Sequence, residues 1–153
     1  IIFRDPVRRL YSELSHKYQC DENLRKKYPT SKDYYWSYLK MGNYSINCEY
    51  VKRIKYYKSL FSTTTIVSED LWGGKNDALA KLSNFLQYDI KNLWPNCYYP
   101  EMGTKAPHHE NLADQYESDL EDLTDDDLVY GRKYLAKYYD EWYNEFGTTP
   151  WRC

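Results

Sequence analysis

The sequence predicts an α/β domain, because two segments of strand character each lead into a segment of helical character. The first is the apolar run Ile1–Phe3, which is typical of the end of a buried strand and is followed by a helical pattern from Pro6. The second is Thr63–Val67, whose β-branched composition favours a strand and which precedes a helical pattern beginning near Asn76. With 153 residues the chain has the length of one domain, and we expect residues 1–153 to form a single one.

The first predicted helix has clear start signals. Asp5 suits an N-cap, and Pro6 suits the first helical position, where its missing N–H costs nothing. Ser12 projects from the polar side of this helix. The apolar stripe on the other side consists of Val7, Leu10, Tyr11 and Leu14. A strand therefore ends in Arg4, turns sharply and leads into an amphipathic helix.

Such a turn suits a phosphate group. The Arg4 guanidinium can donate two parallel hydrogen bonds to a phosphate, and Ser12 can offer its hydroxyl. The start of the helix adds a partial positive charge. We therefore predict an anion site in residues 4–12.

The order Arg-Asp-Pro-Val-x-Arg-x-Tyr-Ser at residues 4–12 resembles the 3′-phosphate-binding motif of sulfotransferases that use 3′-phosphoadenosine 5′-phosphosulfate. The carbohydrate and heparan-sulfate type is the most similar. The resemblance implies that Arg4 and Ser12 hold the 3′-phosphate of the cofactor, and that Arg9 matches the arginine three positions before the serine. The alternative is that these residues only end a strand and begin a helix, as they can in any α/β domain.

A second segment follows the order of the same family: Gly-x-Tyr, a helix, a strand ending in Glu-Asp-Leu, and a helix closing in Phe-Leu. The matching residues are Gly42, Tyr44, Glu69, Asp70, Leu71, Phe85 and Leu86. A tryptophan usual in the helix after Gly-x-Tyr is absent, and Val51 stands near its place. The pair Glu69 and Asp70 could be read as catalytic carboxylates, but we prefer a structural role at the strand end.

In this family a loop before the last helix closes over the nucleotide with lysine, glycine and arginine. Gly103-Thr-Lys105 lies in the corresponding region without the arginine, which makes Lys105 a candidate phosphate contact. His108 and His109 follow, but adjacent histidines without further ligands at fixed spacing are typical of plain loops. We expect no metal.

The resemblance implies a P-loop-like fold with a parallel sheet flanked by helices, of which this chain is the C-terminal portion. It implies transfer of a sulfuryl group from 3′-phosphoadenosine 5′-phosphosulfate to a hydroxyl or amine, with a carbohydrate acceptor and 3′-phosphoadenosine 5′-phosphate as product. The phosphate loop and the catalytic base are expected upstream of Ile1, so this chain alone is expected to be inactive. Two alternatives are a non-catalytic sulfotransferase-like module that binds nucleotide or a partner, and a relative of nucleotide kinases.

Composition limits the partners and the compartment. The 21 basic and 23 acidic side chains nearly balance, so we expect no nucleic-acid partner. No apolar run approaches the roughly 20 residues of a membrane span. Cys20, Cys48, Cys97 and Cys153 lack metal-ligand spacing and could form two disulfides or remain free thiols. Together with the sequon at Asn43, they are compatible with a Golgi lumen, where many relatives of the motif reside; the alternative is the cytoplasm.

The remaining segments predict helices and one exposed connection. Residues 19–31 are charged and turn-rich, and we expect them to be exposed. Residues 32–40 predict an aromatic helix that ends at Gly42, and residues 47–60 predict a second helix. The packing side of the second helix is predicted to consist of Val51, Ile54, Tyr57 or Lys58, and Phe61. Thr124 and three aspartates open a last helix that Gly147 ends. Its predicted packing side consists of Leu128, Tyr134 or Leu135, Tyr138, Trp142 and Phe146.

Overall fold

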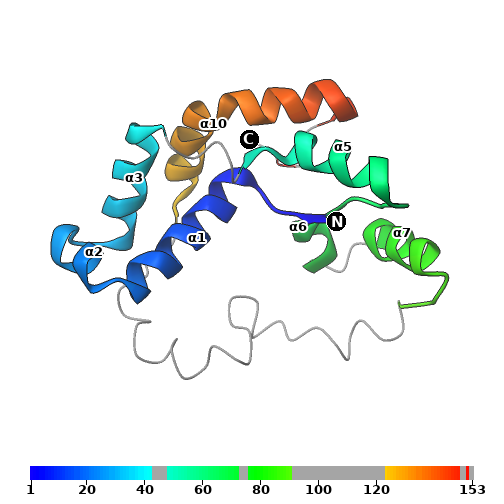
Figure 1. The fold of residues 1–153 in the computed structure, drawn as a ribbon, viewed down its shortest axis with the longest axis horizontal. Coiled ribbons are helices and arrows are strands. Elements are labelled where there is room, and N and C mark those ends of the chain that lie inside the picture. Colours follow the sequence, from blue (N-terminus) through cyan, green and yellow to red (C-terminus); the bar gives the residue numbers. More distant parts are fainter. Residues whose placement is uncertain (43–47, 73–75, 91–122, 149–150, 152–153) are drawn as a thin grey trace. The chain divides into compact units, whose positions relative to one another are not determined.

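A computed structural model describes residues 1–42, 48–72, 76–90, 123–148 and 151. This part of the chain is mostly helical and carries a small parallel sheet of two strands, loosely an α/β arrangement (Figure 1). Its contacts divide the chain into two compact units. One unit comprises Ile1–Arg4 and Ile54–Gln115, and the other comprises Asp5–Arg53 and Tyr116–Cys153.

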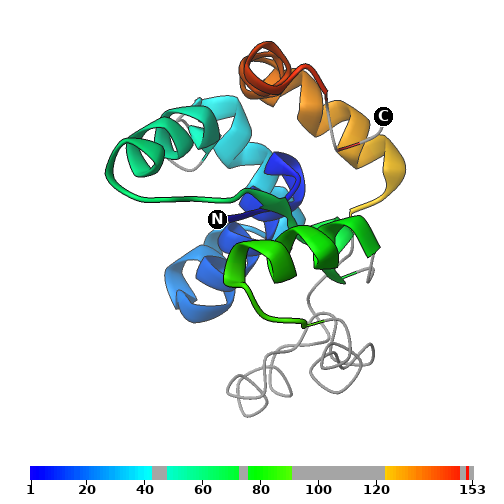
Figure 2. The ribbon, with the colours of Figure 1, turned by 90° about the vertical axis from the view of Figure 1, so that its right-hand side faces the viewer.

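The larger set of helices belongs to the unit of Asp5–Arg53 and Tyr116–Cys153. It contains α1 (Pro6–Cys20), α2 (Glu22–Lys27), α3 (Ser31–Met41) and α10 (Asp125–Phe146). Helices α1 and α3 lie side by side in both ribbon views, and α10 also contacts α1 (Figures 1 and 2). The fourth helix, α2, is short and buries none of its side chains.

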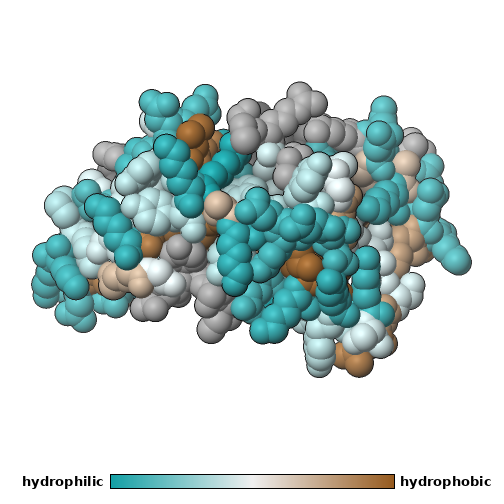
Figure 3. Space-filling view, turned by 90° about the horizontal axis from the view of Figure 1, so that it is seen from above, coloured by the Kyte–Doolittle hydropathy of each residue, from teal (hydrophilic) through white to brown (hydrophobic). Residues whose placement is uncertain are grey.

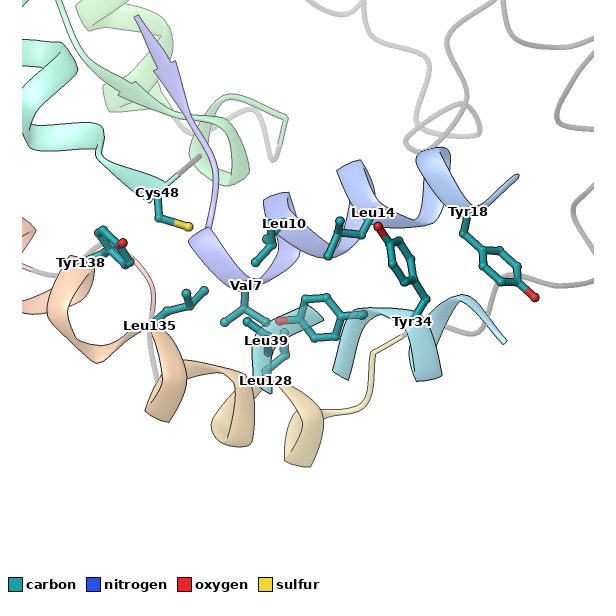
Figure 4. Close-up of a cluster of buried hydrophobic side chains, with 11 residues drawn as sticks. Val7, Leu10, Leu14, Tyr18, Tyr34, Leu39, Cys48, Leu128, Leu135 and Tyr138 are labelled. Atoms are coloured by element: carbon teal, nitrogen blue, oxygen red, sulfur yellow. The ribbon is translucent and has the colours of Figure 1, made fainter. Parts of the chain in front are cut away.

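The core of this unit forms where α1, α3 and α10 meet (Figure 4). Helix α1 contributes Val7 and Leu10, which are fully buried because they recur at helical spacing on its apolar side. Burying such a side chain stabilises the fold by about 1.5–3 kcal/mol. The other members of the cluster are Leu14, Tyr18, Tyr34, Tyr35, Leu39, Cys48, Leu128, Leu135 and Tyr138.

Helix α10 begins and ends as its sequence predicts. The Thr124 hydroxyl accepts a hydrogen bond from the Asp127 amide, and the Asp127 carboxylate accepts one from the Thr124 amide, which forms a complete capping box. Gly147 ends the helix in the left-handed conformation with a φ of 68°. Of the predicted packing side, Leu128, Leu135, Tyr138 and Trp142 are buried.

Gly131 allows α10 to approach α1 closely. A Cβ atom at this position would lie 2.9 Å from Val7 Cγ1 and 3.1 Å from the Tyr35 hydroxyl oxygen. Both distances are shorter than ordinary van der Waals contact, and Val7 and Tyr35 are fully buried. Glycine is therefore required by packing here, not by backbone conformation.

The unit of Ile1–Arg4 and Ile54–Gln115 holds the sheet. Strand β1 (Ile2–Phe3) pairs in parallel with β2 (Ile66–Val67), with Ile2 opposite Ile66 and Phe3 opposite Val67. Helices α6 (Ser68–Trp72) and α7 (Asn76–Leu86) follow, and both contact β2 (Figure 2). Ile66, Leu71, Ala78 and Leu79 form the small core of this unit. Helix α5 (Tyr50–Leu60) begins in the other unit and continues into this one.

Several predicted details are wrong. The first strand is not buried throughout, because Ile2 is 54% exposed and only Phe3 is buried. The connection at residues 19–31 contains α2, whose start is capped by Asp21. In α5, Tyr50 and Ile54 are buried, whereas Tyr57 is exposed, as is Phe61 just beyond the helix. The error in α5 arises because a helical period identifies an apolar stripe but not how far along the helix that stripe meets a core.

The surface seen in Figure 3 is mainly hydrophilic. Hydrophobic residues occur on this face as separate small patches between charged and polar side chains. Single exposed apolar side chains are normal on folded proteins. This face therefore presents mostly groups suited to polar contacts.

Candidate functional site

The candidate site is built around Asp5, the N-cap of α1. Its side chain is buried, and its Oδ1 atom accepts hydrogen bonds from the amides of Val7 at 2.9 Å and Arg8 at 3.2 Å. The Asp5 carbonyl oxygen accepts the Arg9 amide at 2.8 Å. The cap predicted from the sequence is thus confirmed, with Pro6 in the first helical turn.

The same carboxylate also binds two side chains of α10. Arg132 Nη2 donates to Asp5 Oδ2 at 3.1 Å, and the Tyr139 hydroxyl donates to Asp5 Oδ1 at 3.0 Å. The side chains of Arg132 and Asp5 are 17% and 3% exposed, so water screens this ion pair weakly. A buried carboxylate needs such partners, because removal of a charge from water is costly.

The protonation equilibria of the two partners reflect this contact. Burial acts to lower the pKa of Arg132, but its hydrogen bond to Asp5 and the attraction of that charge outweigh burial and raise the pKa. Burial and the nearby Asp5 charge raise the pKa of the Tyr139 phenol well above its ordinary value. Arg132 therefore stays cationic and Tyr139 stays a neutral donor at physiological pH.

The backbone amides at the start of α1 are engaged within the helix. Pro6 has no N–H, the amides of Val7 and Arg8 already bind Asp5 Oδ1, and the Arg9 amide binds the Asp5 carbonyl oxygen. No N–H group of the first turn is left for a phosphate. Hydrogen bonds to an anion at residues 4–12 would therefore come from side chains, while the helix start would contribute its partial positive charge.

The predicted site residues differ in whether their side chains form hydrogen bonds or ion pairs. The side chains of Arg4, directly after β1, and Ser12, in α1, are exposed and make no hydrogen bond or ion pair within the described part of the chain. Arg4 belongs to one unit and Ser12 to the other, and each is described within its own unit. Arg9 pairs with Glu13 at 3.7 Å, and its guanidinium lies 6.0 Å from the centre of the Tyr50 ring. Lys105 lies outside the described residues.

The structure describes the other candidates only in part. Asp70 is partly buried in α6, and the side chain of Glu69 lies outside what the structure describes. Among the described residues, no group of three His, Cys, Asp or Glu side chains could hold a metal ion. His108 and His109, Cys97 and Cys153 fall in the part that is not described, whereas Cys20 and Cys48 are free thiols.

Arg132 and Tyr139 are functional candidates that sequence reasoning missed. Arg132 follows Leu128 by four positions and precedes Leu135 by three, which places it on the packing side of the last helix. A charged residue in an apolar stripe signals a buried partner. That signal could have identified Arg132, but it could not have named Asp5.

Comparison of the chain with protein-family models, with curated proteins and with solved structures gave no match. Within the described residues, no helix combines the length and the apolar character required to cross a membrane.

Proposed function

We propose that this chain contributes the 3′-phosphate contacts of a sulfotransferase that uses 3′-phosphoadenosine 5′-phosphosulfate. The resemblance of residues 4–12 to the family's motif suggests the ligand, and the exposed, uncommitted side chains of Arg4 and Ser12 support it. Arginine suits this task, because its planar guanidinium donates two parallel hydrogen bonds to a phosphate. The single observation that carries the proposal is the exposed Arg4 directly after the strand, whose guanidinium has no hydrogen bond or ion pair with any residue that the structure describes.

The surrounding charges also suit an anion. Asp5 follows Arg4 directly, and an unpaired carboxylate there would repel a phosphate. Arg132 neutralises this carboxylate.

In the reaction, the sulfuryl group moves from the nucleotide to a hydroxyl or amine of a carbohydrate acceptor, and the acceptor proton passes to a base. Arg4 and Ser12 would hold the leaving nucleotide by its 3′-phosphate, which fixes the reacting group in place. We assign neither the base nor the contacts of the sulfuryl group to a described residue. A fold of the P-loop type and a Golgi location are parts of the same proposal.

Thermal unfolding in the presence of the expected product, 3′-phosphoadenosine 5′-phosphate (adenosine 3′,5′-bisphosphate), tests the proposal. At about 100 times its dissociation constant, a ligand that binds only the folded protein adds roughly 2.7 kcal/mol of stability. We expect this compound to raise the melting temperature and adenosine 5′-phosphate, which lacks the 3′ group, to do so much less. Arg4→Ala should abolish the difference, and Ser12→Ala should reduce it.

Arg8→Ala is the matched control, because it removes an exposed arginine four positions away while leaving Arg4 and Ser12 in place. It should retain most of the stabilisation. Equal stabilisation by the two nucleotides, or no stabilisation of a folded sample, would reject the assignment of residues 4–12 to a 3′-phosphate.

A further inference from the structure

The end of helix α5 exposes a cluster of large apolar side chains, all within the unit of Ile1–Arg4 and Ile54–Gln115. Its members are Tyr56, Tyr57, Leu60 and Phe61, which are 61%, 44%, 54% and 62% exposed. The Phe61 amide donates to the Tyr57 carbonyl oxygen at 2.9 Å, so the helical path continues to Phe61 and places these two side chains one turn apart. Tyr56 and Leu60 have the same spacing. A contiguous exposed cluster, unlike a single exposed side chain, marks an interaction site.

This cluster continues a side of the helix that is buried one turn earlier. Ile54 is 1% exposed and lies three positions before Tyr57. The apolar side of α5 therefore extends beyond the part that the fold covers. Its exposed end leaves apolar surface in water, which a partner would remove.

Basic side chains border the cluster. Lys55 and Lys58 are exposed, and Lys58 lies three positions before Phe61, so these two are neighbours on the helix surface. Residues 50–68 contain no Asp or Glu. The end of α5 therefore combines apolar groups with positive charge, which is the pattern of helices that lie on membrane surfaces.

The end of α7, in the same unit, provides a comparison. It also exposes an apolar pair, Phe85 at 43% and Leu86 at 53%. Residues 82–90, however, contain Asp89 and neither Lys nor Arg. Of these two helix ends, only that of α5 joins an exposed apolar cluster to basic side chains.

We propose that residues 54–61 of α5 form a contact site for membrane surfaces that contain anionic phospholipids. Tyr57, Leu60 and Phe61 enter the boundary between headgroups and acyl chains, and Lys55 and Lys58 bind the anionic headgroups. Lysine suits this position, because its aliphatic stem lies along apolar surface while its ammonium group reaches the headgroups. The helix lies on the membrane in this contact and does not cross it.

Two other occupants fit these observations less well. In a symmetric pair of copies the cluster would meet itself, which would bring the lysines of both copies together and cause repulsion. An anionic polysaccharide could bind Lys55 and Lys58, but it would leave Leu60 and Phe61 without an apolar partner.

Co-sedimentation of the full chain with lipid vesicles tests the proposal. We expect binding to vesicles of phosphatidylcholine with about 30% phosphatidylserine, and binding at least about tenfold weaker to phosphatidylcholine alone. In about 0.5 M salt the binding to the anionic vesicles should weaken, because screening reduces the attraction of the lysines.

Two double variants separate the apolar contribution from the charged one. Leu60→Ser with Phe61→Ser should weaken binding at least about tenfold. Lys55→Gln with Lys58→Gln should weaken binding roughly 10- to 30-fold and remove the preference for anionic vesicles. These side chains are exposed, so both variants should keep the circular dichroism spectrum and melting temperature of the wild type. Phe61→Trp keeps an aromatic ring suited to the membrane interface and should retain binding.

Matched controls come from other helices. Phe85→Ser with Leu86→Ser removes a similarly exposed apolar pair from α7. Lys133→Gln with Lys137→Gln removes exposed cations from α10. Each control should leave the affinity for anionic vesicles within about twofold of the wild type.

Absence of binding to the anionic vesicles, or equal binding to neutral ones, would overturn the proposal. Equal weakening by the α5 variants and their controls would do the same. A dimer in lipid-free solution that dissociates in Leu60→Ser with Phe61→Ser would assign this face to a second copy. Retention on heparin that requires Lys55 and Lys58, without vesicle binding, would assign the lysines to an anionic polysaccharide. No nucleotide enters the experiment, so its outcome is independent of the proposed function.

Discussion

Arg132 and Asp5 form a largely buried ion pair with a distance of 3.1 Å between Nη2 and Oδ2, although 127 positions separate them in the chain. The pair joins the first turn of α1 to the first half of α10. Together with the Tyr139 hydroxyl and the close approach at Gly131, it fixes how these two helices pack. Their contact is therefore specified by polar groups as well as by apolar burial.

Tyr139→Phe should destabilise the protein by about 1–3 kcal/mol, because it removes a donor from a buried carboxylate and leaves the ring in place. Thermal and urea unfolding measure the loss. Tyr130→Phe is the matched control, since it removes a phenol hydroxyl that binds Tyr134 at 3.0 Å on the surface. The control should change stability by no more than about 0.5 kcal/mol. Equal losses in the two variants would contradict the role of Tyr139.

Gly131→Ala should destabilise the protein even though alanine is the better helix former. The gain in helix propensity is about 1 kcal/mol. The added methyl group would lie 2.9 Å from Val7 Cγ1, and overpacking a rigid core costs typically about 1–3 kcal/mol. We expect a net loss of up to about 2 kcal/mol in urea unfolding.

A double-mutant cycle isolates the contact behind this loss. Val7→Ala alone leaves a cavity and should cost roughly 1–3 kcal/mol. In Val7→Ala with Gly131→Ala, the new methyl group occupies part of that space, so the two losses should not add. Strict additivity would show that the close approach of Gly131 to Val7 does not limit the substitution.

Asp127 should make stability depend on pH. Burial acts against its charge, but hydrogen bonds from Lys32 and Thr124 outweigh it and hold the pKa of the carboxyl below its ordinary value of 3.8. A lowered pKa in the folded state means that the charged form stabilises the fold. This contribution is fully present above the ordinary value and is lost as the pH falls through the lowered pKa.

Asp127→Asn should therefore cost about 1 kcal/mol at neutral pH and close to nothing at the acid limit of the folded protein. Urea unfolding along a pH series measures the difference from the wild type. Asp125→Asn removes an exposed carboxylate from the same helical turn and should cost only a few tenths of a kcal/mol. A difference for Asp127→Asn that stays constant down to acid pH would exclude the ion pair with Lys32 at 2.8 Å as its source.

The Cys48 thiol should react with an alkylating reagent much more slowly than the Cys20 thiol. Burial raises the pKa of the Cys48 thiol to about 12, and the side chain is only 2% exposed. Cys20 lies exposed at the end of α1. With iodoacetamide at mildly alkaline pH, peptide mapping should show Cys20 labelled at least about 100 times faster than Cys48. Comparable rates in the folded protein would contradict the burial of Cys48; after unfolding in urea, the two rates should converge.

The helices that sequence reasoning predicted well are those with local start and stop signals. Helix α1 is predicted by its N-cap Asp5 and by Pro6. Helix α10 is predicted by its N-cap Thr124 and its C-cap Gly147. The short helix α2 was not predicted, because it buries no side chain and its sequence therefore shows no apolar period. In α5 the burial of Ile54 is confirmed. Tyr57 and Phe61 continue its helical spacing but are exposed, and the buried Tyr50 lies one turn before Ile54.

At the candidate site, contacts between sequence neighbours could be predicted, whereas contacts between distant segments could not. The cap by Asp5 follows from residues 5–8 alone. Its consequence, that the first-turn amides are occupied, follows only from the hydrogen bonds. The pairing with Arg132 could not be predicted, because no local pattern states which of many carboxylates a cation in a distant helix will meet.

The separation of α1 from α10 along the chain has a consequence during synthesis on the ribosome. Val7 and Leu10 leave the ribosome long before Leu128 and Leu135, which complete their core. Until α10 follows, the apolar stripe of α1 is only partly covered, and Asp5 lacks its contacts with Arg132 and Tyr139. Nascent chains that lack α10 should therefore recruit chaperones, and folding of this unit should be completed late.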